Sequence, residues 1–285
     1  MAGHAVTWLD VFTAVPLAGN GLCVVHDADD IDDATMLAIA RETRLSETTF
    51  VQTATTREAD YRNRIFTLQG ELAFAGHPSL GTAVAVAHAR GATTAGYVQE
   101  TASGLQPVEV TLDGTRAHAS MRQNASRFGA EHDRATVMAA AGLSADDAHP
   151  TWTPQVVSTG VPHLMAPVRD EDALRRAAVD PALLPTLVRE AGVVCLYLAA
   201  VDPQTGDARA RSFFMGDVGP LEDPATGSAA GPLVAYLAER AGLEQLVVRQ
   251  GDELGRPSML QARVHPDGVI VEGDVVLVAE GRTFG

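Results

Sequence analysis

Cysteine and positive charge are both scarce in this sequence of 285 residues. Its two cysteines, Cys23 and Cys195, each lie in an apolar run, and no Cys/His spacing resembles that of a zinc site. Lys and Arg together number 21 against 36 Asp and Glu, which gives a net charge of −15 and no basic run to offset it locally. We therefore expect two buried thiols and no metal site, and we do not expect nucleic acid as a partner, because an acidic surface repels phosphate.

Long apolar segments are also missing. No apolar stretch approaches the roughly 18 residues that a membrane-spanning helix needs. The N-terminal region has no cationic segment followed by a long apolar one, so we expect no signal peptide. These absences predict a reduced, cytoplasmic protein with no membrane partner.

What is present is the composition of a globular protein, with 46% hydrophobic and 20% charged residues, and the pattern of strands and helices indicates an α+β fold. Strand-like runs dominate, and two helical segments, 79–90 and 229–240, are apolar on almost every face, which indicates that both are buried. Gly76 and Gly227 precede them, and Gly91 and Gly242 follow at the same interval. We interpret this as an internal repeat in which each half wraps a curved mixed sheet around its own helix.

The starts of these two helices are candidate anion sites. A helix N-terminus presents unpaired N–H groups and a partial positive charge, and a preceding glycine lets a ligand come close to the backbone. Two such starts facing one cleft would hold a small carboxylate. The lysine of a phosphate-binding loop and the third glycine of a dinucleotide fingerprint are both missing, so ATP and NAD are not expected.

Four side chains near these starts suit acid–base chemistry at carbon. Taken alone, His77 is a polar residue at a helix start, Asp223 a turn former, Glu47 a surface residue and Ser228 a helix cap. Taken together, at corresponding ends of a repeated unit, they place proton-carrying groups beside an anion clamp.

Three runs resemble signatures of the PhzF-like family of phenazine biosynthesis: SETTFV at 46–51, FAGHPSLGTA at 74–83 and EDPATGSA at 222–229. Residues 10–13 with Gly19 and Asn20, the run 158–163, and Gln250–Gly251 with 255–258 also fit, so the resemblance covers nearly the whole chain.

This resemblance implies the diaminopimelate-epimerase-like fold, with an N-terminal lobe of residues 1–121 plus about 276–285, a C-terminal lobe of 122–275, and an active site in the cleft between them. It implies a cofactor-independent isomerase of secondary metabolism that shifts a double bond in a small cyclic unsaturated amino or imino acid, in a homodimer. Glu47 is then expected to move the proton, with His77 and Asp223 in the same site. Ser46, Gly76, Gly227 and Ser228 are expected to bind the substrate carboxylate.

Two alternatives remain open. Cofactor-independent racemases of this superfamily use two opposed cysteines, each just before a helix-entering glycine, and Ala75 and Thr226 stand at those positions here. The other alternative is a binding or scaffold protein that kept the fold and lost the reaction.

Overall fold

The computed structural model describes residues 3–216 and 219–283, which form two compact units. The first unit contains residues 3–122 and 272–283, and the second contains residues 123–271. The second boundary lies a few residues before the one expected from the sequence. Over the described residues, no helix is long and apolar enough to span a bilayer.

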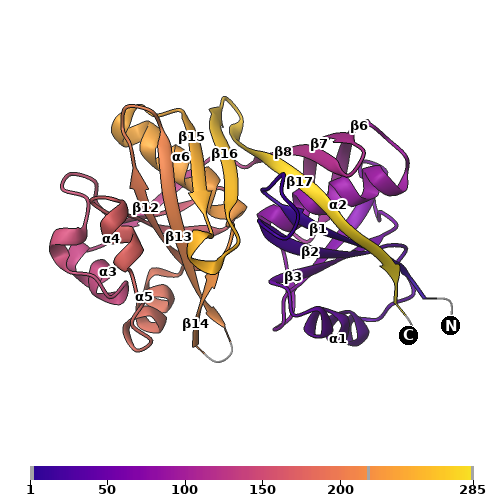
Figure 1. Cartoon of the computed structure of the whole chain (residues 1–285), viewed down its shortest axis with the longest axis horizontal. Coiled ribbons are helices and arrows are strands. Elements are labelled where there is room, and N and C mark those ends of the chain that lie inside the picture. Colours follow the sequence, from indigo (N-terminus) through magenta and orange to yellow (C-terminus); the bar gives the residue numbers. More distant parts are fainter. Residues whose placement is uncertain (1–2, 217–218, 284–285) are drawn as a thin grey trace. The chain divides into compact units, whose positions relative to one another are not determined.

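The first unit is a curved mixed sheet around one helix, α2 (Figure 1). Strands β1 and β2 are antiparallel, β2 and β3 are parallel, β3, β4 and β5 run antiparallel in turn, β4 and β6 are parallel, and β6, β7 and β8 are antiparallel. Its elements are β1 (Ala5–Val11), β2 (Asn20–Val25), α1 (Asp33–Thr43), β3 (Glu47–Gln52), β4 (Tyr61–Phe66), β5 (Glu71–Leu72), α2 (Gly76–Ala89), β6 (Thr94–Thr101), β7 (Gly104–Asp113) and β8 (Arg116–Gln123).

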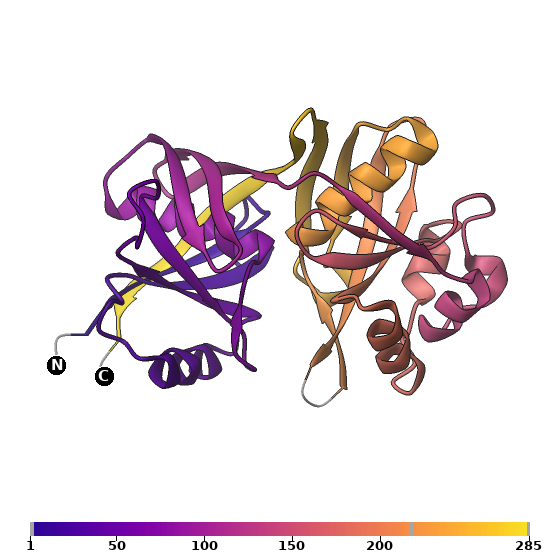
Figure 2. The same ribbon diagram turned by 180° about the vertical axis from the view of Figure 1, so that it is seen from behind.

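The second unit repeats this topology around helix α6 (Figure 2). Strands β10 and β11 are antiparallel, β11 and β12 parallel, β12, β13 and β14 antiparallel in turn, β13 and β15 parallel, and β15 and β16 antiparallel. Its elements are β9 (Arg127–Glu131), α3 (Arg134–Ala140), η1 (Ala145–Asp147), β10 (Gln155–Ser158), β11 (Pro162–Pro167), α4 (Glu171–Arg176), α5 (Leu183–Ala191), β12 (Cys195–Val201), β13 (Asp207–Gly216), β14 (Gly219–Asp223), α6 (Gly227–Ala241), β15 (Gln245–Gln250), η2 (Asp252–Leu254) and β16 (Ser258–His265). The expected repeat and the α+β fold class are thus confirmed strand by strand.

The two central helices are buried along most of their length, as their apolar composition predicts. Both begin earlier than expected, at Gly76 and Gly227, so each helix-entering glycine is the first helical residue. Pro78 has no N–H to donate, and it fits the first turn of α2 because N–H groups in a first turn have no intrahelical acceptor. Gly91 and Gly242 follow the helices with φ of 66° and 68°, which is the left-handed cap that the sequence indicated.

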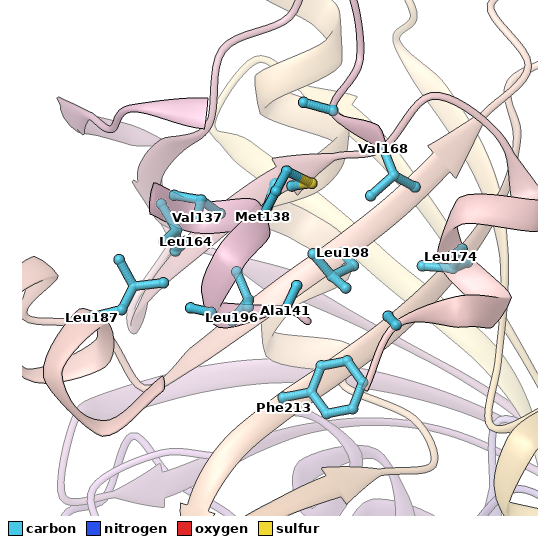
Figure 3. Packing of buried hydrophobic residues seen from close by; sticks show 14 of the residues in the cluster. Val137, Met138, Ala141, Leu164, Val168, Leu174, Leu187, Leu196, Leu198 and Phe213 are labelled. Carbon is cyan, nitrogen blue, oxygen red and sulfur yellow. The ribbon is translucent and has the colours of Figure 1, made fainter. Parts of the chain in front are cut away.

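Each unit has a second core on the outer side of its sheet. In the first unit, α1 covers Phe50 and Phe66. In the second, α3, α4 and α5 pack over β11, β12 and β13, where Val137, Met138, Leu164, Leu174, Leu196, Leu198 and Phe213 interdigitate (Figure 3). In the first unit, this layer lies against β3, the strand that begins at Glu47.

Strand β17 (Gly268–Arg282) runs through Gly273 and Asp274 without a break and pairs with β1. Helix α4 was missed, although Asp170 caps it by accepting from the Ala173 N–H and Arg175 and Arg176 lie in its last turn.

Candidate active site

His77 is the second residue of α2 and is only 4% exposed. Gly76 begins the helix directly before His77, and the whole first turn is buried, so the His77 side chain is buried as well. Burial lowers the pKa of His77 to about 3, so the imidazole is neutral near pH 7. A neutral imidazole has one N–H donor and one acceptor nitrogen.

Asn20, at the start of β2, decides which ring nitrogen of His77 carries the proton. The Asn20 Nδ2 atom lies 3.2 Å from His77 Nδ1, and an amide nitrogen can only donate. His77 Nδ1 is therefore the acceptor, and the proton of the neutral ring is on Nε2. This places an N–H donor on the side of the ring that faces Glu47.

Glu47 is the first residue of β3, directly beside β2, where it pairs with Leu22. Its Oε2 atom lies 3.4 Å from His77 Nε2, and its side chain is 15% exposed. This distance exceeds the usual N–H···O range of about 2.7–3.2 Å, as is common for catalytic pairs without substrate. In this pair, the Glu47 carboxylate can hold a negative charge, and His77 presents its Nε2–H to it.

Strand β3 is fixed against α2 by a buried hydrogen bond. The hydroxyls of Thr49 and Thr82 lie 2.8 Å apart, and both side chains are fully buried. Because β3 and α2 are joined next to the site, Glu47 and His77 keep their spacing. Ser46 precedes Glu47 and is half-buried, and Gly76 begins the helix, so four of the predicted site residues lie together in the first unit.

The start of α2 offers backbone donors beside this pair. The N–H groups of Gly76 and His77 fall in the first turn, ahead of the hydrogen bond from Ser79 N to Ala75 O. Such N–H groups and the helix dipole favour a bound anion. The first unit can therefore hold a carboxylate next to an acid–base pair.

The remaining predicted residues, Asp223, Gly227 and Ser228, lie in the second unit at the corresponding turn. Asp223 ends β14, and Gly227 and Ser228 begin α6. The hydroxyl of Thr226, the residue before α6, donates to Asp223 Oδ2 at 2.6 Å and makes no capping hydrogen bond to the helix. The start of α6 offers the same class of backbone donors as α2.

Both cysteines are buried in strands, as expected. Burial raises the pKa of Cys23 and of Cys195 to about 12, so both thiols are protonated near pH 7. Cys195, at the start of β12, lies 3.0 Å from His163 Nδ1. Neither cysteine precedes a central helix, where Ala75 and Thr226 are found instead.

A metal centre has no support among the residues described here. Within 3–216 and 219–283, no group of three or more His, Cys, Asp and Glu side chains is arranged to hold a metal ion. The groups at the two helix starts are carboxylates, hydroxyls, backbone amides and two imidazoles, that of His77 at α2 and that of His163 beside Ser228 of α6.

Comparison with known proteins decides the family. Residues 9–281 match the family described as phenazine biosynthesis-like protein. The chain belongs to the PhzF-like family. It is 35% identical to the trans-2,3-dihydro-3-hydroxyanthranilate isomerase of Pseudomonas aeruginosa, over 99% of each chain.

Solved structures agree with this assignment. A predicted epimerase from Pseudomonas aeruginosa superimposes with a TM-score of 0.85 at 38% identity over 99% of each chain. The PhzF-family phenazine biosynthesis protein of Bacillus anthracis gives 0.86 at 26% identity over all of both chains. A probable proline racemase from Agrobacterium radiobacter shares the fold, with a TM-score of 0.68 at 12% identity over 99% of this chain and 93% of that one. The expected family and the diaminopimelate-epimerase-like fold are confirmed.

Sequence reasoning missed the residues that support the site. Asn20 and Gln250 were recognised only as part of the family resemblance. The signal for Asn20 was Gly19, which has a φ of 65° and whose added Cβ would lie 2.5 Å from Thr13 Cγ2. A polar residue that follows such a turn and enters a fully buried strand needs a partner.

Proposed function

We propose that this chain is a cofactor-independent isomerase that moves a proton within a small cyclic unsaturated amino or imino acid of secondary metabolism. The dihydro-hydroxyanthranilate of its named relatives is the first substrate to test. The observation that carries the proposal is the Glu47–His77 pair at the start of α2, in which a carboxylate faces an imidazole N–H.

Glu47 acts as the base in this reaction. Its carboxylate removes a proton from an activated ring carbon, and the electron pair of that C–H bond moves into the conjugated system. The protonated Glu47 then returns the proton to another carbon of the same system, so the double bond shifts with no net oxidation or reduction. A positioned acid–base group contributes about 10²–10⁴ to the rate.

His77 and the helix amides stabilise the charge that develops. The Nε2–H of His77 faces the Glu47 carboxylate at 3.4 Å, and we propose that this contact shortens to a hydrogen bond when substrate is bound. Backbone N–H groups at Gly76 and His77 bind the substrate carboxylate, which orients the ring and disperses the carbanion-like charge. We propose the same role for Gly227 and Ser228, and we propose that Asp223 acts in the same reaction as Glu47.

The deciding experiment is Glu47→Gln, assayed with trans-2,3-dihydro-3-hydroxyanthranilate in D₂O by NMR. The wild type is expected to form product, and the deuterium content of the newly protonated carbon measures how far the proton on Glu47 exchanges with solvent before it is returned. The amide cannot act as the base, so kcat of the variant is expected to fall at least 10²-fold. Exposed Glu58→Gln is the matched control and should keep wild-type kcat. Turnover by Glu47→Gln within a few-fold of wild type would exclude this mechanism.

Racemase chemistry is the weaker alternative because it needs two thiolates just before the helices. The residues there are Ala75 and Thr226, and the two cysteines are buried and protonated. A silent binding protein is the other alternative. It would bind 3-hydroxyanthranilate in a titration without exchanging any carbon-bound proton of the dihydro compound.

We further propose a cytoplasmic homodimer. Light scattering on the purified chain should give twice the mass of one chain, and a single-chain mass would count against the dimer without touching the isomerase assignment.

A further inference from the structure

The side chain of Gln250 is inserted into the turn between β14 and α6. Gln250 is the last residue of β15 and is 1% exposed. Its Oε1 atom accepts from the Tyr197 hydroxyl at 3.0 Å and from the Thr226 N–H at 3.3 Å. Its Nε2 atom donates to the Asp223 carbonyl at 2.7 Å and to the Thr226 hydroxyl at 3.0 Å. One amide thus connects both ends of the turn that carries Asp223.

The orientation of this amide is set by backbone groups. The Thr226 N–H can only donate, so it must face Oε1, and the Asp223 carbonyl can only accept, so it must face Nε2. If the amide were rotated by 180°, its NH₂ group would face the Thr226 N–H and its oxygen would face the Asp223 carbonyl, so neither hydrogen bond could form. Gln250 therefore has one orientation in the folded protein.

This orientation fixes the hydroxyl proton of Thr226. The Thr226 oxygen accepts from Gln250 Nε2, so its single O–H is directed away from Gln250. It donates to Asp223 Oδ2 at 2.6 Å, a length typical of a hydroxyl bound to a carboxylate. The chain Tyr197–Gln250–Thr226–Asp223 therefore ends in a hydroxyl that can only donate to Asp223.

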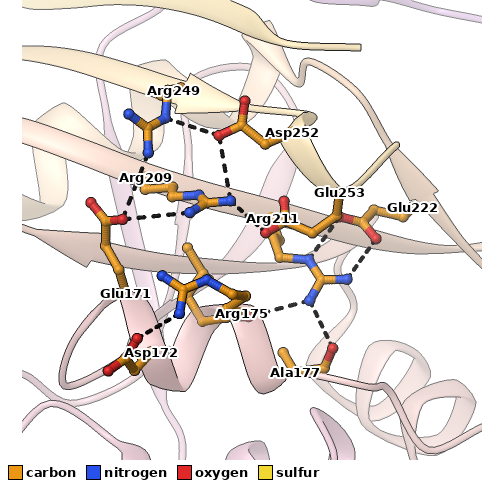
Figure 4. Close-up of polar contacts among 11 residues, drawn as sticks. Glu171, Asp172, Arg175, Ala177, Arg209, Arg211, Glu222, Arg249, Asp252 and Glu253 are labelled. Carbon is orange, nitrogen blue, oxygen red and sulfur yellow. Dashed lines mark hydrogen bonds and ion pairs between the residues drawn. The ribbon is translucent and has the colours of Figure 1, made fainter. Parts of the chain in front are cut away.

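The backbone around Gln250 is held on its outer side as well. Gly251 has a φ of 84°, and an added Cβ would lie 2.6 Å from the Pro224 carbonyl, so β15 contacts the turn without a side chain between them. Beyond it, Asp252 and Glu253 bind Arg209, which also contacts Glu171 (Figure 4).

Glu222 lies on β14, the strand before the turn, and Arg211 of the neighbouring strand β13 donates to both of its carboxylate oxygens at 2.8 Å (Figure 4). Its Nη1 donates to the carbonyls of Leu174 and Ala177. These contacts hold in place the strand and turn that carry the Asp223 side chain.

We propose that Thr226 and Gln250 are positioning residues that hold the Asp223 carboxylate in its working orientation. Gln250 acts through Thr226, and neither residue needs to touch the substrate. This inference rests on the proposed function, in which Asp223 acts in the same reaction as Glu47. Thr226 stands where a racemase of this superfamily has a cysteine, and here its hydroxyl orients the Asp223 carboxylate.

The test compares Thr226→Val, which keeps the β-branched shape and loses the hydroxyl, with Thr226→Ser, which keeps the hydroxyl. With the dihydro-hydroxyanthranilate, kcat of Thr226→Val is expected to fall at least tenfold while KM stays within about threefold. Thr226→Ser is expected to recover kcat to within about threefold of wild type. Gln250→Glu, which loses the donor to Thr226, should resemble Thr226→Val.

Two further measurements separate positioning from folding and from the proposed function. Adding Thr226→Val to Asp223→Asn should lower kcat no further, because the hydroxyl acts only through the carboxylate. Crystal structures should show the Asp223 carboxylate turned away in Thr226→Val and unmoved in Thr226→Ser.

An unmoved Asp223 in Thr226→Val, or a kcat for Thr226→Val within threefold of wild type, overturns the proposal. The crystallographic result stands whether or not the dihydro compound is turned over. A normal kcat for Glu47→Gln would instead overturn the proposed function.

Discussion

A single hydrogen bond from Asn20 sets the proton position on His77, and through it the environment of Glu47. Asn20→Asp tests this because the shape is kept and the donor is lost. A carboxylate at position 20 accepts from Nδ1–H, which would leave the lone pair of Nε2 facing the Glu47 carboxylate. We expect kcat to fall about 10²-fold, within the range that a positioned acid–base group contributes.

The expected change in tautomer can be observed directly. Nitrogen-15 NMR of the imidazole should show the proton on Nε2 of His77 in the wild type and on Nδ1 in Asn20→Asp. Asn124→Asp makes the same chemical change at an exposed position and should alter neither property. An unchanged tautomer in Asn20→Asp would contradict the role given to Asn20.

The sequence predicted the chemical groups of the site better than their supports. Glu47, His77 and Asp223 stand in specific motifs, and the first two are indeed neighbours. Asn20, Thr226 and Gln250 matter through hydrogen bonds between residues far apart in the chain, and a single sequence carries no record of such pairs. Their types, buried amides and a hydroxyl, are compatible with many other partners.

At the scale of elements, buried helices and strands were predictable because composition reports burial. Segments 79–90 and 229–240 are apolar all round, and both are central helices. Their starts were misplaced because glycine and proline are poor helix formers, whereas the first helical turn tolerates both. Strand β17 could not be predicted as one element, because Gly273–Asp274 is typical of a turn.

The outer core of the second unit should govern stability without affecting catalysis. Leu198, on β12, is fully buried under α3, α4 and α5 (Figure 3). Leu198→Ala leaves a cavity and should lower the free energy of unfolding by about 2–5 kcal/mol. Urea denaturation measures this loss, and kcat of the folded variant should be unchanged.

Leu183→Ala is the matched control, since the same side chain is 45% exposed at the start of α5. Its effect should stay within about 0.5 kcal/mol. Equal losses in the two variants would show that the cluster is not a core.

At the scale of the whole molecule, buried histidines predict how stability depends on pH. Burial lowers the pKa of His77 to about 3 and of His163 to about 4, and that of His26 and His149 in the same direction. Between the unfolded value of about 6.5 and these folded values, the unfolded chain binds more protons than the native protein. The free energy of unfolding is therefore expected to fall as pH drops from 6.5 towards 4.

His163→Gln isolates one contribution to this slope. The variant should have a lower free energy of unfolding at pH 7. Between pH 6.5 and 4, the slope of its free energy of unfolding against pH should be smaller than that of the wild type, by up to about 1.4 kcal/mol per pH unit. Urea denaturation at several pH values measures the difference. Stability curves that run parallel to wild type over this range would show that His163 is not held neutral.

The repeated topology has a consequence for the history of such chains. At the start of α2 the side chains are Asn20, Glu47 and His77, which carry charge and protons. In the second unit, β12 begins at Cys195, and His163 and Ser228 are the second residues of β11 and α6. The carboxylate at this helix start, Asp223, comes from a different strand, β14. A duplicated unit gives selection two copies of one scaffold to vary separately. Mutation can therefore change the side chains around one helix start while those around the other are kept.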